Sequence, residues 1–224
     1  PSSLTVALLL GIAGFPLECV RGDAIPQTVN QNTLTGTADG WLLPIWGTPA
    51  AVAVAGNDYV VPSGFTLRTP NSLTPGQFAG DKLIVQGTLA IKSGNAILAQ
   101  NLVLAGGSVN HSQGPTSPTA TTNTYLAGTL VVSNNSTLNT SSGSGIRDIT
   151  LWAALSGSAD LTVSSSTNSL HIDCDSTGYS GNWNINVRVM VYRGGSNPMG
   201  FGASPSICSK IGANPPPGVR KLVV

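Results

Sequence analysis

The stretch Gly128–Asn139, GTLVVSNNSTLN, places Leu130 and Val132 at alternate positions before a polar turn and Leu138 after it. Two other stretches share this order of strand, polar turn and strand: Gly87–Leu98, GTLAIKSGNAIL, and Ser158–Leu170, SADLTVSSSTNSL. Because a β-strand points every second side chain to the same face, each stretch predicts short strands with one apolar face. Related units of this kind are typical of a solenoid, in which each coil lays short strands on its neighbours.

Apolar pairs at a spacing of two residues recur from residue 81 onward, and no stretch after residue 24 shows a sustained helical period. We therefore predict an all-β fold, a right-handed parallel β-helix, or solenoid, of short strands. A β-sandwich is the alternative, because many short strands separated by turn residues fit both architectures. The pairs are Leu89/Ile91, Leu102/Leu104, Leu130/Val132, Ile149/Leu151, Leu161/Val163 and Leu170/Ile172.

The composition favours an exported β protein. Charged residues make up 8% of the chain, against an average of about 25%. Ser, Thr, Asn and Gly account for 91 of the 224 residues, which suits strands and turns rather than helices. Residues 25–186 hold four basic and seven acidic residues, and this balance argues against nucleic acid as a partner.

The first 24 residues differ from the rest. An apolar run, LTVALLLGIAGFPL, is too short to span a bilayer and precedes a small residue, Ala24. We expect residues 1–24 to be a signal peptide with a truncated start, cut after Ala24, because the chain opens on Pro1. A buried N-terminal helix is the alternative. The expected location is secreted or at the cell surface, and no later apolar run predicts a transmembrane segment.

The remaining chain divides into three parts. Residues 25–80 are irregular and are expected to form an N-terminal capping region, with short strands at 52–54, 59–61 and 65–67. Residues 81–186 are expected to form the β-solenoid repeats, interrupted by a loop at 114–124 that lacks large apolar side chains. Residues 187–224 hold five basic residues and no acidic one. We interpret them as an irregular basic tail, either natural or translated out of frame from a longer gene, and we expect the chain to be part of a longer protein.

One stretch, SLHIDCDSTGYSGNWNIN (169–186), places His171, Asp173 and Asp175 at alternate positions. An imidazole with two carboxylates is a plausible metal shell. Same-face neighbours on one strand lie about 7 Å apart, however, so the three do not converge on one ion. We predict instead that they face solvent while Cys174 points inward. Whether Cys174 pairs with Cys208 stays open.

Other signals of chemistry are few. The nucleophile elbow G-x-S-x-G and the calcium-binding nonapeptide repeat are absent from the sequence. We therefore assign no catalytic, cofactor-binding or metal-binding residue, and we do not expect an enzyme. A carbohydrate-active β-helix is the alternative, and it would need acids from adjacent coils to gather near Asp160, His171, Asp173 and Asp175. Four tryptophans are candidates for either sugar stacking or the core: Trp41, Trp46, Trp152 and Trp183.

The segment 149–186, ITLWAALSGSADLTVSSSTNSLHIDCDSTGYSGNWNIN, resembles the autotransporter-associated β-strand repeat. The resemblance extends over residues 41–186, with two departures from the pattern, Ala159 and Cys174 in places where glycine is common. It implies a right-handed parallel β-helix passenger that is exported and exposed at the cell surface, and it brings no catalytic residues. The matching positions are Leu155, Gly157, Ala159, Leu161, Leu170, Ile172, Gly178, Tyr179, Ser180, Gly181 and Ile185.

The leading hypothesis is therefore a non-enzymatic structural or adhesive segment of a large secreted β-solenoid protein. The alternative is a carbohydrate-active β-helix, either a polysaccharide lyase or a sugar-binding module. A cell-surface or extracellular polysaccharide is the expected partner under either hypothesis.

Overall fold

The computed structural model describes residues 22–31, 39–71, 76–92, 97–111, 122–140, 147–174 and 176–191. Within these ranges the regular structure is almost entirely β-strand, with one short 3₁₀ helix, η2 (Gly40–Leu42). The prediction of an all-β fold is confirmed. Most of the expected signal and of the basic tail lies outside the described residues, as do Asp175, Cys208 and most of the expected loop.

The strands of the described part are short, apart from four, β7, β9, β13 and β15, that continue around a bend of the coil. They are β1 (Ile25–Pro26), β2 (Asp58–Val61), β3 (Thr66–Arg68), β4 (Gly76–Gln77), β5 (Lys82–Val85), β6 (Thr88–Ile91), β7 (Ile97–Ala105), β8 (Ser108–His111), β9 (Thr122–Asn134), β10 (Ser136–Asn139), β11 (Arg147–Leu151), β12 (Ala154–Gly157), β13 (Leu161–Ile172), β14 (Gly178–Tyr179) and β15 (Trp183–Val191).

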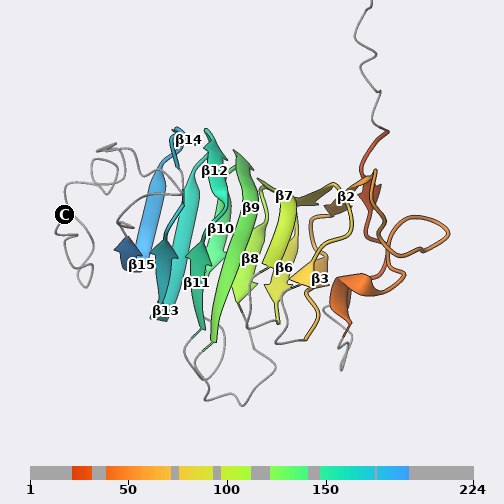
Figure 1. The fold of residues 1–224 in the computed structure, drawn as a ribbon, viewed down its shortest axis with the longest axis horizontal. Coiled ribbons are helices and arrows are strands. Elements are labelled where there is room, and N and C mark those ends of the chain that lie inside the picture. Colours follow the sequence, from red (N-terminus) through yellow and green to blue (C-terminus); the bar gives the residue numbers. More distant parts are fainter. Residues whose placement is uncertain are drawn as a thin grey trace, which may run out of the picture.

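These strands stack side by side in three parallel ladders (Figure 1). The first ladder holds β1, β2, β5, the later parts of β7 and β9, β12 and β14. The second holds β3, β6, β8, β10 and the first parts of β13 and β15. The third holds β4, the first parts of β7 and β9, β11, and the last parts of β13 and β15. Because every pairing between these named strands is parallel, the fold is a parallel β-solenoid and not an antiparallel sandwich.

Register partners form columns of side chains inside the coils. In the first ladder Tyr59, Leu83, Leu102, Leu130 and Leu155 follow one another as partners, at steps of 24, 19, 28 and 25 residues. The coils therefore differ in length while the strand register is kept. The β7–β9 pair, which has the longest step, also carries two register shifts, between Ala99 and Asn101 and between Leu104 and Ala105.

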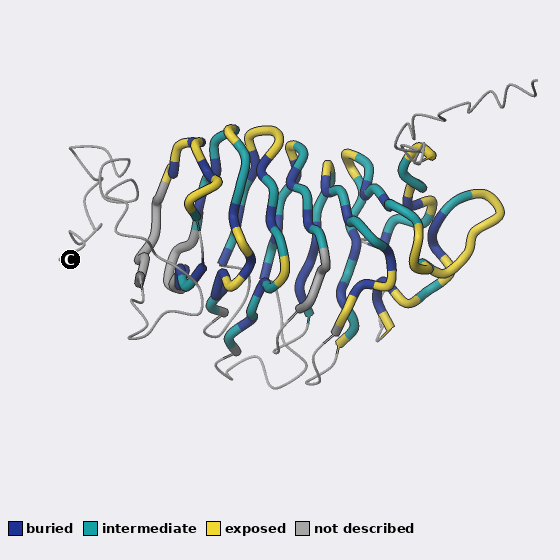
Figure 2. The backbone as a smooth tube through the Cα atoms, turned by 45° about the horizontal axis from the view of Figure 1, so that its top comes forward, coloured by how far each residue is buried: buried dark blue, intermediate teal, exposed yellow. Residues whose placement is uncertain are grey.

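The core lies inside the stacked coils. Every residue of the six predicted apolar pairs is at most 3% exposed, which confirms them as core. Burying a leucine or valine side chain contributes roughly 1.5–3 kcal/mol, so repetition of the pairs supplies most of the driving force for folding. Figure 2 shows buried and less buried residues alternating along successive coils, as the period of a strand requires.

The three related stretches do not occupy equivalent places in the coil. Thr88–Ile91 lies in the second ladder, whereas the matching residues Thr129–Val132 lie in the first. Leu161–Ser164 returns to the second ladder. All three ladders need the same alternation of inward and outward side chains, so the likeness of the stretches reflects strand structure and not position within a repeat.

Parallel pairing already begins in the segment for which the sequence predicts a cap. β2 pairs with β5 and β3 pairs with β6, which confirms strands at 59–61 and in most of 65–67. The strand expected at 52–54 is wrong. Val52 and Val54 are 48% and 50% exposed, because this segment lies in a surface loop that follows the turn at Gly47–Ala50.

Side-chain amides cover the outer edge of β3, the first strand of the second ladder. Asn30 Oδ1 accepts from the Thr66 amide at 3.0 Å, and Gln31 Oε1 accepts from the Arg68 amide at 2.7 Å. Gln27 Nε2 donates to the Thr66 carbonyl at 2.9 Å. These bonds satisfy backbone groups that would otherwise offer an edge for further strand pairing, while β1 covers the edge of β2.

An aromatic cluster closes the N-terminal end of the core. Trp46 packs edge-on against Tyr59 and Phe78, with ring centroids 5.0 and 5.6 Å apart, and Trp41 contacts Phe78 at 5.6 Å. All four rings are at most 2% exposed. Together with the amide contacts on β3, this cluster explains how the first coil is shielded from water.

Candidate functional site

Three rows of outward side chains cross neighbouring coils on the third ladder, over β9, β11 and β13. Tyr125, Thr150 and His171 are register partners in the middle row. Asn123 and Asp148 are partners in the row before it. Trp152 and Asp173 directly follow the buried partners Leu151 and Ile172 and form the third row. We call these seven outward residues the third-ladder patch.

Polar contacts within the patch join residues of different coils. Asp148 Oδ2 lies 3.3 Å from His171 Nε2, and Trp152 Nε1 donates to Asp173 Oδ2 at 3.2 Å. Thr150 Oγ1 donates to Asn123 Oδ1 at 3.0 Å. Each contact bridges two coils, so the stacking of the solenoid determines the arrangement of the patch.

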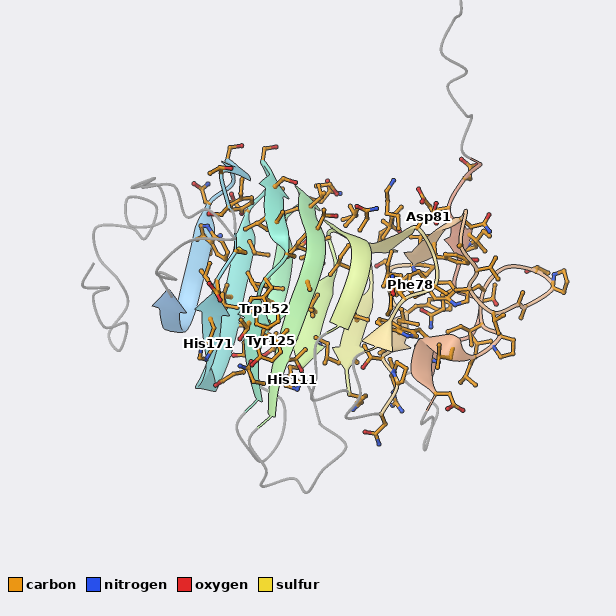
Figure 3. All side chains as sticks on the ribbon, viewed as in Figure 1. Phe78, Asp81, His111, Tyr125, Trp152 and His171 are labelled. Atoms are coloured by element: carbon orange, nitrogen blue, oxygen red, sulfur yellow. The ribbon has the colours of Figure 1, made fainter. Side chains whose placement is uncertain are left out.

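Tyr125 and Trp152 form an aromatic pair at the surface. Their ring centroids are 4.2 Å apart and their planes are inclined by 35°. Trp152 is 37% exposed, whereas Trp41, Trp46 and Trp183 are at most 4% exposed. The structure therefore assigns three of the four tryptophans to the core and leaves Trp152 as the one that a ligand can reach. Figure 3 shows Tyr125, Trp152 and His171 grouped over the middle coils, away from Phe78 and Asp81.

The prediction that His171 faces solvent is wrong in part. Its side chain alternates with the buried Leu170 and Ile172 and so points away from the core, but it is only 9% exposed. Thr150, its outward partner on β11, is also buried. An outward side chain in the middle of a ladder is flanked by those of the coils on either side, so it can lose its contact with water without entering the core. Asp173 is half-buried, and Cys174 is buried as predicted.

The second histidine lies inside the coil behind the patch. His111 is fully buried and contacts Thr124 Oγ1 at 3.1 Å through Nε2. Its Nδ1 lies 3.0 Å from the backbone carbonyl oxygen of Asp148. Both ring nitrogens thus have partners, which is the usual condition for a structural histidine in a core.

Asp160 does not join the patch, although the carbohydrate-active alternative placed it there. It lies at the corner before β13, where its amide donates to Asn135 Oδ1 at 2.9 Å. Its Oδ1 accepts from Asn182 Nδ2 at 2.8 Å and from the Asn182 amide at 3.1 Å. These three residues stack in successive coils as a polar ladder, and the role of Asp160 is structural.

The same corner perturbs a tyrosine. Tyr179 is buried, and its hydroxyl lies 2.8 Å from the Ala159 carbonyl and 3.0 Å from that of Asn182. Burial and then the negative charge of Asp160 raise the pKa of Tyr179 to about 12. The phenol is therefore held in its neutral, donating form.

We expect this tyrosine to make stability pH-dependent in the alkaline range. An unfolded tyrosine titrates near pH 10, so between about pH 10 and 12 only the unfolded state loses this proton. The contribution of Tyr179 to the free energy of unfolding is complete below about pH 10 and is lost as pH rises through about 12. Urea unfolding across this range measures it. Tyr179→Phe should show a shallower alkaline decline than the wild type, with Tyr125→Phe as the control; equal slopes in Tyr179→Phe and wild type would contradict the assignment.

The groups that the patch offers to a ligand are polar and aromatic. Among the described residues, no group of three or more His, Cys, Asp and Glu side chains is placed to hold a metal ion. No helix of the described ranges is long and apolar enough to cross a membrane. The patch presents aromatic carbon, carboxylate oxygens and hydroxyl groups. A weak signal for the patch was present in the sequence, because Trp152 directly follows the apolar pair Ile149/Leu151 and is therefore expected to point outward.

Comparison with known proteins finds no matching family model, no similar curated protein and no similar solved structure.

Proposed function

We propose that this chain is a non-enzymatic structural or adhesive segment of a secreted or surface-exposed β-solenoid protein. The observation that supports this proposal is the capped, continuous stack of coils. Side-chain amides and β1 cover its first edges, and polar side chains join successive coils at their corners. An extended scaffold of this kind presents outward side chains in fixed rows, which suits contact with a large surface.

The proposal includes export and a partner outside the cell. The apolar first residues are those expected of a signal peptide, and the repeat resembles that of autotransporter passengers. The low content of charged residues, 8% of the chain, also suits an extracellular surface of small polar side chains. A cell-surface or extracellular polysaccharide is the proposed partner.

One observation favours the carbohydrate-active alternative. Two carboxylates, a histidine and an exposed tryptophan lie together on the third-ladder patch. Glycoside hydrolysis commonly uses two carboxyl groups, one on each side of the scissile bond. Here Asp148 is only 17% exposed and is paired with His171, and Asp173 accepts from Trp152. Carboxylates engaged in this way suit binding better than proton transfer.

The two functions can be separated with one set of polysaccharides. The purified protein is immobilised and tested for retention of soluble polysaccharides, and the same samples are assayed over time for new reducing ends and for unsaturated products. Retention without product supports the adhesive function. Product that accumulates with time, and that is lost in both Asp148→Asn and Asp173→Asn, would establish the enzymatic alternative instead.

A further inference from the structure

We propose that the third-ladder patch is a binding site for a neutral polysaccharide chain that lies along the solenoid axis, with the exposed face of Trp152 as its main contact. This inference rests on the proposed adhesive function and names the ligand class and the residues that bind it.

The aromatic pair provides the apolar part of the site. A sugar ring presents a face of C–H groups, and the face of a tryptophan is a suitable flat apolar partner. Trp152 is 37% exposed, while Tyr125 packs against its other side at a centroid distance of 4.2 Å. The Tyr125 ring therefore supports the indole, while 37% of Trp152 stays exposed to a ligand.

The indole is also held in one orientation. Its Nε1–H donates to Asp173 Oδ2 at 3.2 Å, from the next coil, while Tyr125 contacts it from the preceding coil. An anchor that is fixed before binding loses less conformational entropy when the ligand arrives. Three other large apolar side chains are exposed at the N-terminal end, namely Leu42, Val52 and Val54. Trp152 differs from them because its orientation is fixed by a hydrogen bond and a ring contact.

The polar groups around the indole favour a neutral, hydroxyl-rich ligand. Asp173 is half-buried and retains oxygen lone pairs that can accept from sugar hydroxyls. Asp148, with 17% of its side chain exposed, adds a second carboxylate. Carboxylate oxygens, those of Asp173 above all because Asp148 is paired with His171, disfavour a polyuronate or another anionic polymer, whereas a neutral saccharide meets them as a hydrogen-bond donor.

The rows of the patch define the direction of the ligand. β9, β11 and β13 are neighbours in the ladder, at the usual spacing of about 4.8 Å between strands. Tyr125, Trp152 and Asp173 therefore present one group from each of three successive coils. A ligand that follows this direction over the three strands extends about 10 Å, so an oligosaccharide or a polymer fits better than a single sugar.

The test compares variants on neutral and acidic polysaccharides, with soluble starch or β-glucan as the neutral probe and polygalacturonate as the acidic one. We expect the wild type to bind a neutral probe and Trp152→Ala to weaken this binding at least tenfold, the usual effect of removing an interface anchor. Trp152→Phe keeps an aromatic face without the indole N–H and should lose less. Leu42→Ala removes an exposed apolar side chain far from the patch and serves as the control.

The outcomes distinguish a failure of the proposed binding site at Trp152 from a failure of the proposed adhesive function. Thermal unfolding of each variant shows whether it is folded. If Trp152→Ala does not fold, the binding of Trp152→Phe is compared with that of the wild type instead. Neutral-probe binding that is unchanged in Trp152→Ala and in Trp152→Phe would overturn the site while leaving the adhesive function standing. Preference for polygalacturonate, or no binding of any probe, would overturn the ligand class. Turnover of a probe would overturn the adhesive function itself.

Discussion

Replacing Gly157 by alanine is expected to destabilise the protein by at least about 3 kcal/mol. Gly157 has a φ of +111°, a conformation that other residues rarely adopt. A Cβ at this position would fall on the backbone of Val132 in the neighbouring coil, including its carbonyl oxygen. Gly157 is a register partner of both Val132 and Tyr179, so separating the strands would weaken the ladder on two sides.

A matched substitution at a second glycine separates two contributions to the loss of stability: the clash of the new Cβ with the Val132 backbone, and the strain of a positive φ. Gly64 also has a positive φ, +82°, but a Cβ there would meet nothing within 4 Å. Gly64→Ala should therefore cost only about 1 kcal/mol. Urea unfolding followed by circular dichroism and by tryptophan fluorescence measures both variants. If both variants lost the same free energy of unfolding, contact with the Val132 backbone would not limit the packing of β12 on β9.

The second large effect is expected at Trp46. Trp46→Ala should cost about 3–5 kcal/mol, the usual range for removing a large aromatic side chain from a core. Trp46 is 1% exposed and contacts Tyr59 and Phe78 edge-on. The backbone bridges of Trp46 to Gln27 and to Ala51 are kept in this variant, so the expected loss comes from the side chain. Its loss would leave a cavity beneath the whole N-terminal cap.

Two further substitutions test this reason. The Nε1 atom of Trp46 is buried without a hydrogen-bond partner, so Trp46→Phe keeps an aromatic ring and removes an unsatisfied donor. We expect it to cost clearly less than Trp46→Ala in the same urea unfolding experiment. Val52→Ala removes an apolar side chain of the same region that is 48% exposed, and should change stability by less than about 0.5 kcal/mol. A loss in Trp46→Ala as small as that in Val52→Ala would show that the aromatic cluster does not stabilise the cap.

Much of the fold was predictable because every coil repeats one simple requirement. A parallel ladder with one buried face needs apolar side chains at alternate positions, and the sequence meets this need in short pairs such as Leu130/Val132 and Leu170/Ile172. The segment 52–54 shows the limit of that signal. Ala and Val alternate there, but no strand among the described residues pairs with Val52 or Val54, and both remain exposed.

The candidate site was predictable only in part. The alternation in the sequence predicted that His171 and Asp173 lie on the outward face of a strand. It did not distinguish Trp152 from the other three tryptophans. It did not associate Asp148 with His171 or Trp152 with Asp173. Those pairs are 23 and 21 residues apart along the chain and meet only because β11 and β13 are adjacent.

The alternation of apolar and polar residues along the chain sets which side chains point inward and which point outward within each strand. Which strands are neighbours, and which outward side chains meet, depends on how the coils stack. The physical reason is that coil length varies, from 19 to 28 residues between partners of the first ladder, while all three ladders accept the same apolar alternation. Alternation alone therefore cannot assign a strand to its ladder, and the contacts that build the third-ladder patch depend on that assignment.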